Sequence, residues 1–486
     1  MSEPDNLLER RLAGEHQTLA RPLRTLVHRP PVVCNQRSTV NDALAVMRTE
    51  GIGCIVVVDA RARPVGIFTE RDLIGVALDA RLDQPIDEAM TPEPLGLPGH
   101  TPAYDAALLM IERRIRHVLV TEGDELVGVV SERELFSLQR LGLGELSMEI
   151  RLARDVDGLA AMAARVRRLA RLLVEQGVAA EHLTLFISVL NDRICQRVIE
   201  LARNHHQWER ISWCWLSFGS EGRLEQTFGT DQDNGLIFEA HDRSTSSEVR
   251  GRLLPFAREV NEALDACGYP LCKGNVMASN PEFCLSIEEW KAKVQGWLHN
   301  SDPKALLDAA ICFDFRGMHG DERLTAELRS WLLKLTRVSA NFLRLMAENA
   351  LQARPPLGRW RDFVTEDAPN APGTINLKLY GVRPFVDCAR VMALARGLPQ
   401  TSTAERLRAA SVAGAIPKAE AEAAVAAFFF LQSVRLRHQG ECEVLTGDLV
   451  NRIDPARLNT LDRRTLKEAF RIARELQSGL ALDYQL

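Results

Sequence analysis

The stretch Trp213–Glu239, WCWLSFGSEGRLEQTFGTDQDNGLIFE, decides the fold of the central part of this chain. Its two ends are the apolar runs Trp213–Phe218 and Leu236–Phe238, which are short and apolar as buried strands are. Small residues at 219–220 break the first run, and two carboxylates come just before the second. The pattern predicts a strand, a tight turn with a short helical segment, and a second strand that begins at the two carboxylates.

The residues inside this stretch predict a site for a nucleotide and a metal ion. In a turn at Gly219 that opens into a helix, backbone N–H groups and the Ser220 hydroxyl can surround a triphosphate. Arg223 can add a charge-assisted bond to phosphate. Asp231 and Asp233 are two residues apart, so strand alternation sends both side chains to one face, roughly 7 Å apart along the strand. Such carboxylates can hold Mg²⁺ or Mn²⁺ during an in-line phosphoryl displacement.

The full phrase G-S-x-G-R-x-E…T-D-x-D resembles the nucleotidyltransferase superfamily that includes DNA polymerase β. It is closest to the branch with the uridylyltransferase of the PII signalling protein, and to a related bacterial group joined to CBS-domain pairs. The resemblance implies a uridylyl- or adenylyltransferase-like enzyme that moves NMP from an NTP to a protein acceptor, such as a signalling protein, or to a small molecule. Gln232 and Asn234 are polar where many superfamily members have apolar strand residues, which is a mild departure.

Enzymes of this superfamily usually need a third carboxylate from a later strand, and Ala305–Asp321 supplies candidates. The run Ile311–Phe315 is expected to be a strand, with Asp314 inside it as the first candidate for a third metal ligand and Asp308 as the second. A carboxylate in such apolar surroundings is costly unless it is paired or metal-bound. The alternative is an ion pair between Asp314 and Arg316 or another arginine.

A polar loop follows the central stretch, at Tyr269–Trp290. Its turn carries Lys273 and Asn275, and a second turn carries Ser279. These side chains could bind base or ribose, and the alternative is that glycine and proline only shape a loop there.

An internal repeat lies before the central stretch, with its copies at Thr39–Leu73 and Ala103–Phe136. Each copy is expected to form helix, strand, turn, strand and helix. The phrase G-[IV]-[FV]-[ST]-E-R-[DE]-L occurs in both copies and resembles the signature of a tandem pair of CBS domains, a Bateman module. The resemblance implies AMP, ADP or ATP in the cleft between the repeats and pairing of modules into a homodimer. It gives phosphate and ribose contacts to the residues Thr69, Asp72, Ser131 and Glu134, where Glu134 replaces the aspartate of the first copy. The alternative is that Asp72 and Glu134 only cap or solvate their helices.

The composition is that of a soluble globular protein with several domains. The 486 residues are 46% hydrophobic and 26% charged, with a net charge of −5. The acidic balance and the lack of a basic, aromatic-interleaved stripe argue against nucleic-acid binding. Ten cysteines without CxxC spacing are expected to be free thiols in a reducing cytoplasm. Neither a signal peptide nor a membrane span is expected.

The expected fold is α/β and multidomain. Helices are expected around the central domain, at Leu159–Leu173 and Leu183–Leu201 before it and at Leu324–Glu348 and beyond after it, so the C-terminal third is predicted to be a helix bundle. This last region resembles the partner domain of the same transferases, which implies that it faces the active site and helps to bind acceptor or nucleotide. The expected parts are a lead-in (1–22), the CBS pair (23–142, divided into 23–82 and 83–142), a helical linker (143–206), the nucleotidyltransferase domain (207–330) and the helical partner domain (331–486).

Two functional classes remain beside the transferase. The first is a non-catalytic adaptor, in which nucleotide occupancy changes a partner interaction. The second is an enzyme that adds nucleotides to RNA ends, which the charge balance disfavours.

Overall fold

The computed structural model describes residues 22–27, 29–69, 72–73, 76, 82–113, 115–123, 125–131, 143–175, 177–206, 211–240, 242–299, 303–358, 362–368, 371–442 and 448–486. The chain divides into two compact units, 1–149 and 150–486, and the boundary falls inside one helix. Among the described residues, no helix has both the length and the apolar character that a membrane crossing requires.

The first unit contains both copies of the repeat. Its first sheet has the order β1-β2-β3-β4 and its second the order β5-β6-β7. The described elements are η1 (Leu23–Thr25), β1 (Val33–Asn35), α2 (Val40–Glu50), β2 (Cys54–Val58), β3 (Pro64–Thr69), η2 (Ile86–Glu88), β4 (Thr91–Pro92), β5 (Gly96–Pro98), α4 (Ala103–Arg113), β6 (His117–Glu122), β7 (Glu125–Ser131) and α6 (Leu143–Leu152).

Local sequence signals explain how the repeat folds. Thr39 and Asp42 form a capping box at the start of α2, and Gly51 ends that helix in the left-handed conformation that favours glycine. Val56 and Val58 of the first sheet pack with Leu119 of the second into one apolar cluster. The helix–strand–turn–strand order expected for each copy is therefore confirmed, while the residues expected to form the closing helices lie largely outside the described residues.

The second unit is built around a four-stranded sheet of order β10-β9-β8-β11. These strands are β8 (Trp213–Ser217), β9 (Asn234–Phe238), β10 (Cys284–Ser286) and β11 (Arg316–Gly320). β8 pairs antiparallel with both β9 and β11, and β10 runs parallel to β9. The strand–turn–strand order expected for the central stretch is confirmed.

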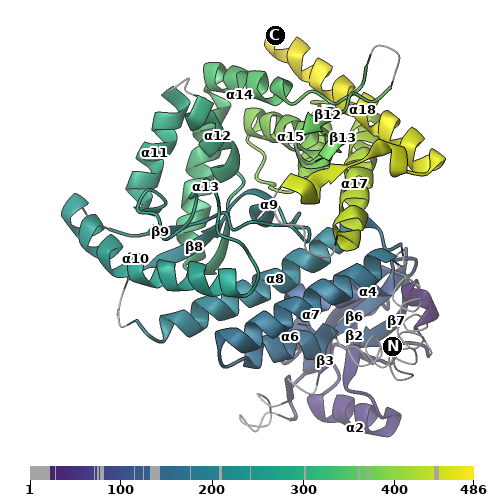
Figure 1. Cartoon of the computed structure of the whole chain (residues 1–486). Helices are drawn as coiled ribbons and strands as arrows, with labels where there is room; N and C mark the ends of the chain where they lie inside the picture. Colours follow the sequence, from purple (N-terminus) through teal and green to yellow (C-terminus); the bar gives the residue numbers. More distant parts are fainter. Residues whose placement is uncertain are drawn as a thin grey trace, which may run out of the picture. The chain divides into compact units, whose positions relative to one another are not determined.

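Helices cover both faces of this sheet, as Figure 1 shows. Trp213 and Trp215 make edge contacts with Phe256 of α10 on one face. Phe218 packs against Trp290 of α11 on the other face. Because successive side chains of β8 reach opposite, equally buried layers, its sequence is apolar at every position instead of alternating. The covering helices are α7 (Val156–Glu175), α8 (Ala180–Arg203), α9 (Gly219–Gly222), α10 (Arg243–Ala266), α11 (Ile287–His299), α12 (Pro303–Cys312) and α13 (Glu322–Arg337).

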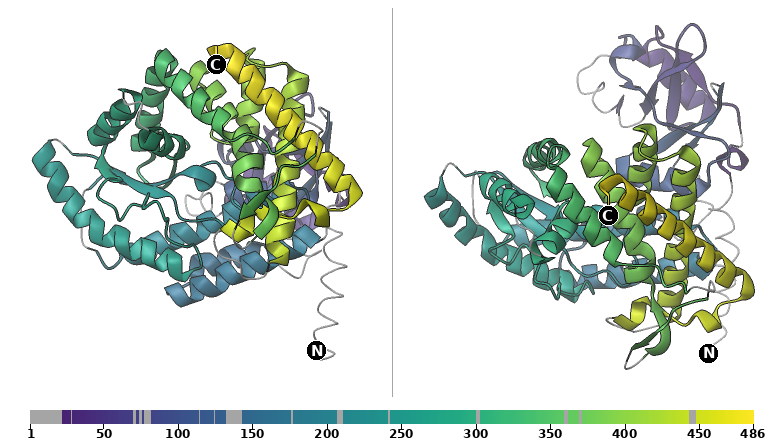
Figure 2. Two further views of the ribbon diagram at one scale, coloured as in Figure 1. Left: turned by 45° about the horizontal axis from the view of Figure 1, so that its top comes forward. Right: turned by 90° about the horizontal axis from the view of Figure 1, so that it is seen from above.

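The C-terminal helices form one bundle beside the sheet in both views of Figure 2. Two short strands and one turn of π-helix, which we call the π-turn, precede its central helix α15. The elements are α14 (Ala340–Gln352), β12 (Glu366–Ala368), β13 (Ala371–Asn376), η3 (Lys378–Val382), α15 (Arg383–Arg396), α16 (Thr403–Val412), α17 (Lys418–Glu441), η4 (Asp448–Asn451), β14 (Arg452–Ile453), η5 (Pro455–Arg457) and α18 (Thr460–Tyr484).

The structure corrects two of the expected elements. The run Ile311–Phe315 is not a strand, because α12 continues to Cys312 and β11 begins only at Arg316. Asp314 therefore lies in the short connection between them. The helix expected over Leu324–Glu348 is divided in two, because α13 ends before Val338 and α14 starts after Ser339.

Candidate functional site

The turn after β8 brings a carboxylate against the backbone of the glycine-serine motif. The N–H of Phe218 donates to the carbonyl of Asp233 at 2.8 Å, which extends the pairing of β8 with β9. Gly219 has a φ of +54°, and a Cβ there would lie 2.9 Å from Oδ2 of Asp233. Glycine is required at this position both for the left-handed backbone and for the close approach of the carboxylate.

Asp231 and Asp233 lie just before β9, and the residue between them points the other way. Gln232 is buried, and its Nε2 donates to the carbonyls of Asn261 and Tyr269. Asp231 is exposed and Asp233 is half-buried. Burial raises the pKa of Asp233 and the negative charge of Asp231 adds to this, while a hydrogen bond from Cys272 opposes it. Two mutually repelling carboxylates therefore sit next to the turn.

This pair of carboxylates fits a hard divalent cation whose coordination is completed by a substrate. Among the described residues, no three His, Cys, Asp or Glu side chains gather as a metal-binding group. Mg²⁺ is commonly held by one or two carboxylates together with substrate phosphates and water, so a protein cage is not required. The close approach that Gly219 permits leaves an Asp233 oxygen beside the place where phosphates would lie against the turn.

Asp314 is the centre of an arginine cluster, and we correct its assignment as a third metal ligand. Its Oδ1 accepts bonds from Nε of Arg390 at 3.0 Å and Nη1 of Arg406 at 2.6 Å. Its Oδ2 accepts bonds from Nη1 of Arg223 at 2.7 Å and Nη2 of Arg390 at 2.6 Å. Four donors use the four lone pairs of a carboxylate, which leaves none for a metal. The ion-pair alternative is the one that the contacts support, with three arginines other than Arg316.

The charge of Asp314 is held by its partners. Its side chain has no exposed surface. Burial alone would raise the pKa of Asp314, but the guanidinium groups of Arg390, Arg406 and Arg223 hold it well below its usual range. Gly222 allows this segment to approach the turn, since a Cβ at Gly222 would lie 1.8 Å from the Asp314 carbonyl oxygen.

Arg223 is committed to the same cluster. Its Nε donates to Glu225 at 2.7 Å and its Nη1 donates to Asp314. Glu225 in turn accepts the backbone N–H of Thr403 at the start of α16. The arginine and glutamate of the G-S-x-G-R-x-E phrase thus join the turn to the helical bundle, and phosphate binding by Arg223 would compete with these contacts.

Asn234 and Asn261 explain why the strand with the two carboxylates carries polar residues. Nδ2 of Asn261 donates to Oε1 of Gln232 at 2.7 Å and to Oδ1 of Asn234 at 3.0 Å. Oδ1 of Asn234 also accepts the N–H of Ala278. These buried amides tie the carboxylate segment to α10 and to the loop after it, so each polar group has a partner.

The loop with the second set of expected nucleotide contacts is anchored beside the carboxylates. The N–H of Asn234 donates to the carbonyl of Val276, and Nδ2 of Asn280 donates to the carbonyl of Asn275. The side chains of Lys273 and Asn275 are exposed on this loop, and Asp308 lies on α12. The roles expected for these three residues therefore stay predictions.

Lys378 and Arg435 lie next to the site but were not among the residues expected to bind nucleotide. Desolvation by the surrounding protein lowers the pKa of Lys378, and the positive charge of Arg435 lowers it further. The negative charges of Asp231 and Asp233 oppose this change. The lysine is the first residue of the π-turn η3, a distortion that is frequent at functional sites. The sequence signal was a lysine within the apolar phrase INLKLYGV, and nothing in its spacing pointed to the two aspartates.

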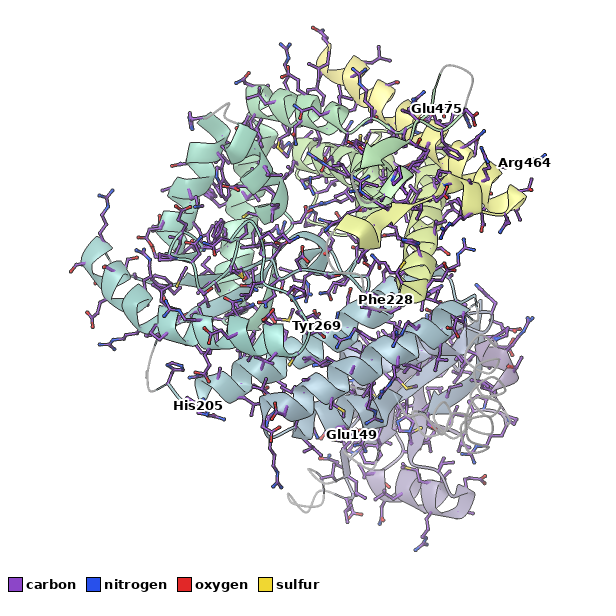
Figure 3. The ribbon with its side chains drawn as sticks, in the orientation of Figure 1. Glu149, His205, Phe228, Tyr269, Arg464 and Glu475 are labelled. Carbon is purple, nitrogen blue, oxygen red and sulfur yellow. The ribbon has the colours of Figure 1, made fainter. Side chains whose placement is uncertain are left out.

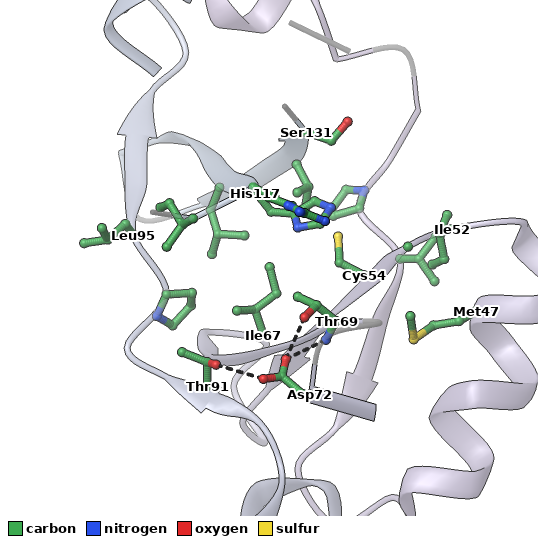
Figure 4. Close-up of a pocket in the computed structure, with 18 of the residues that line it drawn as sticks. Met47, Ile52, Cys54, Ile67, Thr69, Asp72, Thr91, Leu95, His117 and Ser131 are labelled. Carbon is green, nitrogen blue, oxygen red and sulfur yellow. Dashed lines mark hydrogen bonds between the residues drawn. The ribbon is translucent and has the colours of Figure 1, made fainter. Parts of the chain in front are cut away.

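The first unit contains a cavity of about 1340 Å³ that is lined by both copies of the repeat (Figure 4). Thr69 and Asp72 line it from the first copy and Ser131 from the second. Asp72 accepts bonds from the N–H and hydroxyl of Thr69, at 2.9 and 2.8 Å, so it also has the capping role considered above. Glu134 lies outside the described residues.

Three family models match the chain. A CBS-domain model matches residues 23–79 and 86–140. A model described as "Putative nucleotidyltransferase DUF294" matches residues 164–304. A model described as "Putative nucleotidyltransferase substrate binding domain" matches residues 340–484.

Curated relatives cover about a fifth of the chain. An uncharacterized 17.7 kDa protein of Acidianus ambivalens is 34% identical over 98 residues, which are 20% of this chain and 60% of that protein. An arabinose 5-phosphate isomerase of Salmonella typhi is 36% identical over 104 residues, 21% of this chain and 31% of that protein. The chain therefore spans only part of the length of these relatives.

Solved structures of CBS-domain proteins are also similar. A CBS domain protein of Pyrobaculum aerophilum complexed with AMP is 29% identical and covers 26% of this chain and 98% of its own, with a TM-score of 0.24. A CBS-domain containing protein of Agrobacterium tumefaciens is 29% identical and covers 25% and 96%, with a TM-score of 0.24.

Proposed function

Because this chain joins a CBS-domain pair to a DUF294 nucleotidyltransferase domain and its C-terminal substrate-binding domain, we propose that it is a metal-dependent nucleotidyltransferase. It transfers NMP from an NTP to a protein or small-molecule acceptor, and adenine nucleotides at the CBS pair regulate it. The observation that supports this most strongly is the pair Asp231 and Asp233, of which Asp233 packs against the turn at Gly219.

In the proposed reaction, the two carboxylates hold the metal ion and the turn orients the phosphates. Asp231 and Asp233 would hold Mg²⁺ or Mn²⁺, which supplies Lewis-acid stabilisation of the reacting phosphate oxygens. Gly219 and Ser220 orient the phosphates beside Asp233. The acceptor oxygen bonds to the α-phosphorus while the bond from the α-phosphorus to the bridging oxygen breaks, and pyrophosphate leaves with the electron pair. The acceptor gives its proton to solvent or to a nearby base.

A labelling experiment tests the transfer. The purified full chain is incubated with each labelled NTP, Mg²⁺ or Mn²⁺, and cell extract as a source of acceptors. We expect one nucleotide to label one acceptor, and an Asp231→Ala, Asp233→Ala double variant to lose this labelling. Labelling by the wild type that never exceeds that of the double variant contradicts the proposal.

The lining of the CBS cavity supports the regulatory part of the proposal. Among the described residues, the arginines Arg29, Arg48, Arg113 and Arg116 line it together with the acidic residues Asp72 and Glu93. An excess of guanidinium groups suits an anionic ligand, since arginine binds phosphate through paired donors. The ligand would be AMP, ADP or ATP, and its polar groups would meet a lining that includes Thr69, Asp72 and Ser131.

A non-catalytic adaptor is the second candidate, and the assignment of Asp314 favours it. Since Asp314 serves three arginines, Asp231 and Asp233 are what is left of the expected set of three metal ligands. An adaptor would bind nucleotide without a metal ion, and the double aspartate variant would keep its function in cells. Calorimetry with and without EDTA, together with complementation by that variant, separates the two candidates.

A further inference from the structure

The helical bundle presents two cations, Lys378 and Arg435, close to the candidate site. Within the described part of the chain, neither Lys378 nor Arg435 forms an ion pair with Asp or Glu. The arginines of the neighbouring cluster, in contrast, share the carboxylates Asp314, Glu225 and Asp387. Arg435 is buried, and a buried charge without a counter-ion is costly, so its retention indicates an anionic partner that the protein itself does not supply.

Arg435 is held in a fixed orientation by neutral groups. Its Nη1 donates to Oε1 of Gln432 at 2.6 Å and its Nη2 donates to Oδ1 of Asn451 at 2.9 Å. The residue is only 5% exposed, and its Nε is buried without a hydrogen-bond partner. Amide oxygens orient a guanidinium but leave its full charge, which is the state that an incoming anion requires.

The segment around Gly229, which leads to the two aspartates, packs against α17 close to Arg435. A Cβ at Gly229 would lie 3.6 Å from Nε2 of Gln439 and 2.9 Å from a methyl carbon of Val450. Oε1 of Gln439 is also buried without a hydrogen-bond partner. Arg435 lies one helical turn before Gln439, so this cation and its fixed partners adjoin the segment that ends at Asp231.

Lys378 completes this group from the π-turn. The turn packs against α17 and follows β13 directly. The lysine side chain is exposed, and it lies within electrostatic range of both Arg435 and the two aspartates. Two cations and two carboxylates in one neighbourhood fit a polyanion that shares a divalent cation with the carboxylates.

We propose that Lys378 and Arg435 form a subsite for the β- and γ-phosphates of the nucleoside triphosphate, next to Asp231 and Asp233. This inference rests on the proposed function, because it assigns the polyphosphate of that substrate to the helical bundle. Lysine acts as a point charge for phosphate and arginine as an oriented fork. When the bond from the α-phosphorus breaks, the electron pair passes to pyrophosphate, and these cations stabilise the new charge.

Inorganic pyrophosphate with Mg²⁺ is a probe that depends neither on the base nor on the acceptor. In calorimetry with the full chain, we expect wild type to bind it, and Lys378→Met and Arg435→Gln each to weaken binding at least tenfold. Arg435→Lys is expected to recover part of the loss. Neither substitution lies in the first unit, so any pyrophosphate bound in its cavity contributes equally to all proteins.

Lys418→Met and Arg464→Gln are the matched controls. Lys418 is exposed at the start of α17, and Arg464 is exposed on α18, on the outer side of the bundle (Figure 3). Both are expected to bind pyrophosphate as wild type does, and thermal unfolding verifies that every variant is folded.

Three outcomes decide the inference. Unchanged pyrophosphate affinity in Lys378→Met and Arg435→Gln overturns it. Normal pyrophosphate affinity with impaired acceptor labelling also overturns it, and assigns the two cations to the acceptor. Weakened pyrophosphate binding in a chain that labels no acceptor supports the subsite while the proposed function fails.

Discussion

At the scale of single residues, the site depends on how closely backbone and carboxylate approach at Gly219. Since its φ is +54° and a Cβ would meet Oδ2 of Asp233 at 2.9 Å, alanine there strains the turn and displaces the carboxylate. We expect Gly219→Ala to lower the free energy of unfolding by about 1–3 kcal/mol. We expect transfer to fall about 100-fold, because small displacements of a reacting group have effects of that size.

The control for this prediction is Gly251→Ala. Gly251 lies in α10, and a Cβ there would meet nothing within 4 Å. Alanine in a helix is expected to stabilise the protein by about 0.4–1 kcal/mol, and transfer should not change. Denaturant unfolding and the labelling rate measure both effects, and a Gly219→Ala enzyme with normal labelling would contradict the assigned role of the turn.

Asp314 and Asp231 should separate stability from activity. Asp314→Asn leaves three buried arginines with a neutral partner, so we expect unfolding to become easier by about 3–5 kcal/mol. Asp231→Asn is expected to change stability by less than about 0.5 kcal/mol, because the residue is exposed, and to abolish transfer. Urea unfolding decides the matter: an Asp314→Asn protein that is as stable as wild type but inactive would restore Asp314 as a metal ligand.

The sequence predicted the turn and the two aspartates but not the role of Asp314. The glycine, serine and aspartates lie within fifteen residues, so local patterns of strand and turn place them together. Two of the three arginine partners of Asp314 come from α15 and α16, and all three lie more than seventy residues away in the sequence. Spacing along the chain does not predict which distant arginines surround a carboxylate, and the apolar neighbours of Asp314 suited a metal ligand and an ion pair equally.

At the scale of elements, patterning predicted the existence of helices and strands better than their ends. The apolar run before Asp314 belongs to α12, because a short apolar run suits a buried helix as well as a buried strand. The break between α13 and α14 falls at Val338 and Ser339, where the sequence has no glycine or proline to indicate the end of a helix. Lys378 stands out in the sequence as a lysine within an apolar phrase, but a π-turn has no sequence period of its own that would place this lysine beside the aspartates.

Glu289 joins three elements at the edge of the sheet, and its contribution to the free energy of unfolding should depend on pH. Its carboxylate, on α11, accepts the N–H of Ser286 in β10 at 2.8 Å and bonds from Ser246 and Arg250 of α10. Burial opposes ionisation, but the bonds from Arg250, Ser286 and Ser246 lower the pKa of Glu289 to about 2. We expect Glu289→Gln to cost about 1–3 kcal/mol of unfolding free energy at pH 7.

The sign of the pH dependence follows from the lowered pKa. The folded state holds the proton less tightly than the unfolded state, whose pKa is near 4.5. The stabilisation is therefore complete above pH 4.5 and is lost as the pH falls towards 2. Unfolding free energies of wild type and Glu289→Gln should converge over that range. Glu288→Gln, at an exposed neighbour paired only with Lys291, is the control and should be nearly neutral.

At the scale of the whole molecule, each of the two units has its own kind of candidate site. The repeat in the sequence marks the site of the first unit, and the long motif at Trp213–Glu239 marks that of the second. Sequence reasoning predicted the CBS pair because a pattern that occurs twice is hard to produce by chance. The resemblance implied that the helical bundle faces the active site, but the sequence did not show which cations of the bundle would lie next to the aspartates. Phosphate sites built from two domains leave no single motif, because each domain carries only part of the charge.

The link between the units is tested by AMP. If the cavity of the first unit binds AMP, saturation at 100 times Kd should add about 2.7 kcal/mol to the unfolding free energy of that unit. The same AMP concentrations should change the rate of acceptor labelling.

A Thr69→Val, Asp72→Asn variant should lose both responses, because it removes a hydroxyl and a carboxylate from the cavity lining. Asp87→Asn, at an exposed residue of η2, should keep both. AMP binding without any change in labelling would contradict regulation, and a rate response that survives in the Thr69→Val, Asp72→Asn variant would place the effect of AMP at the transferase site instead.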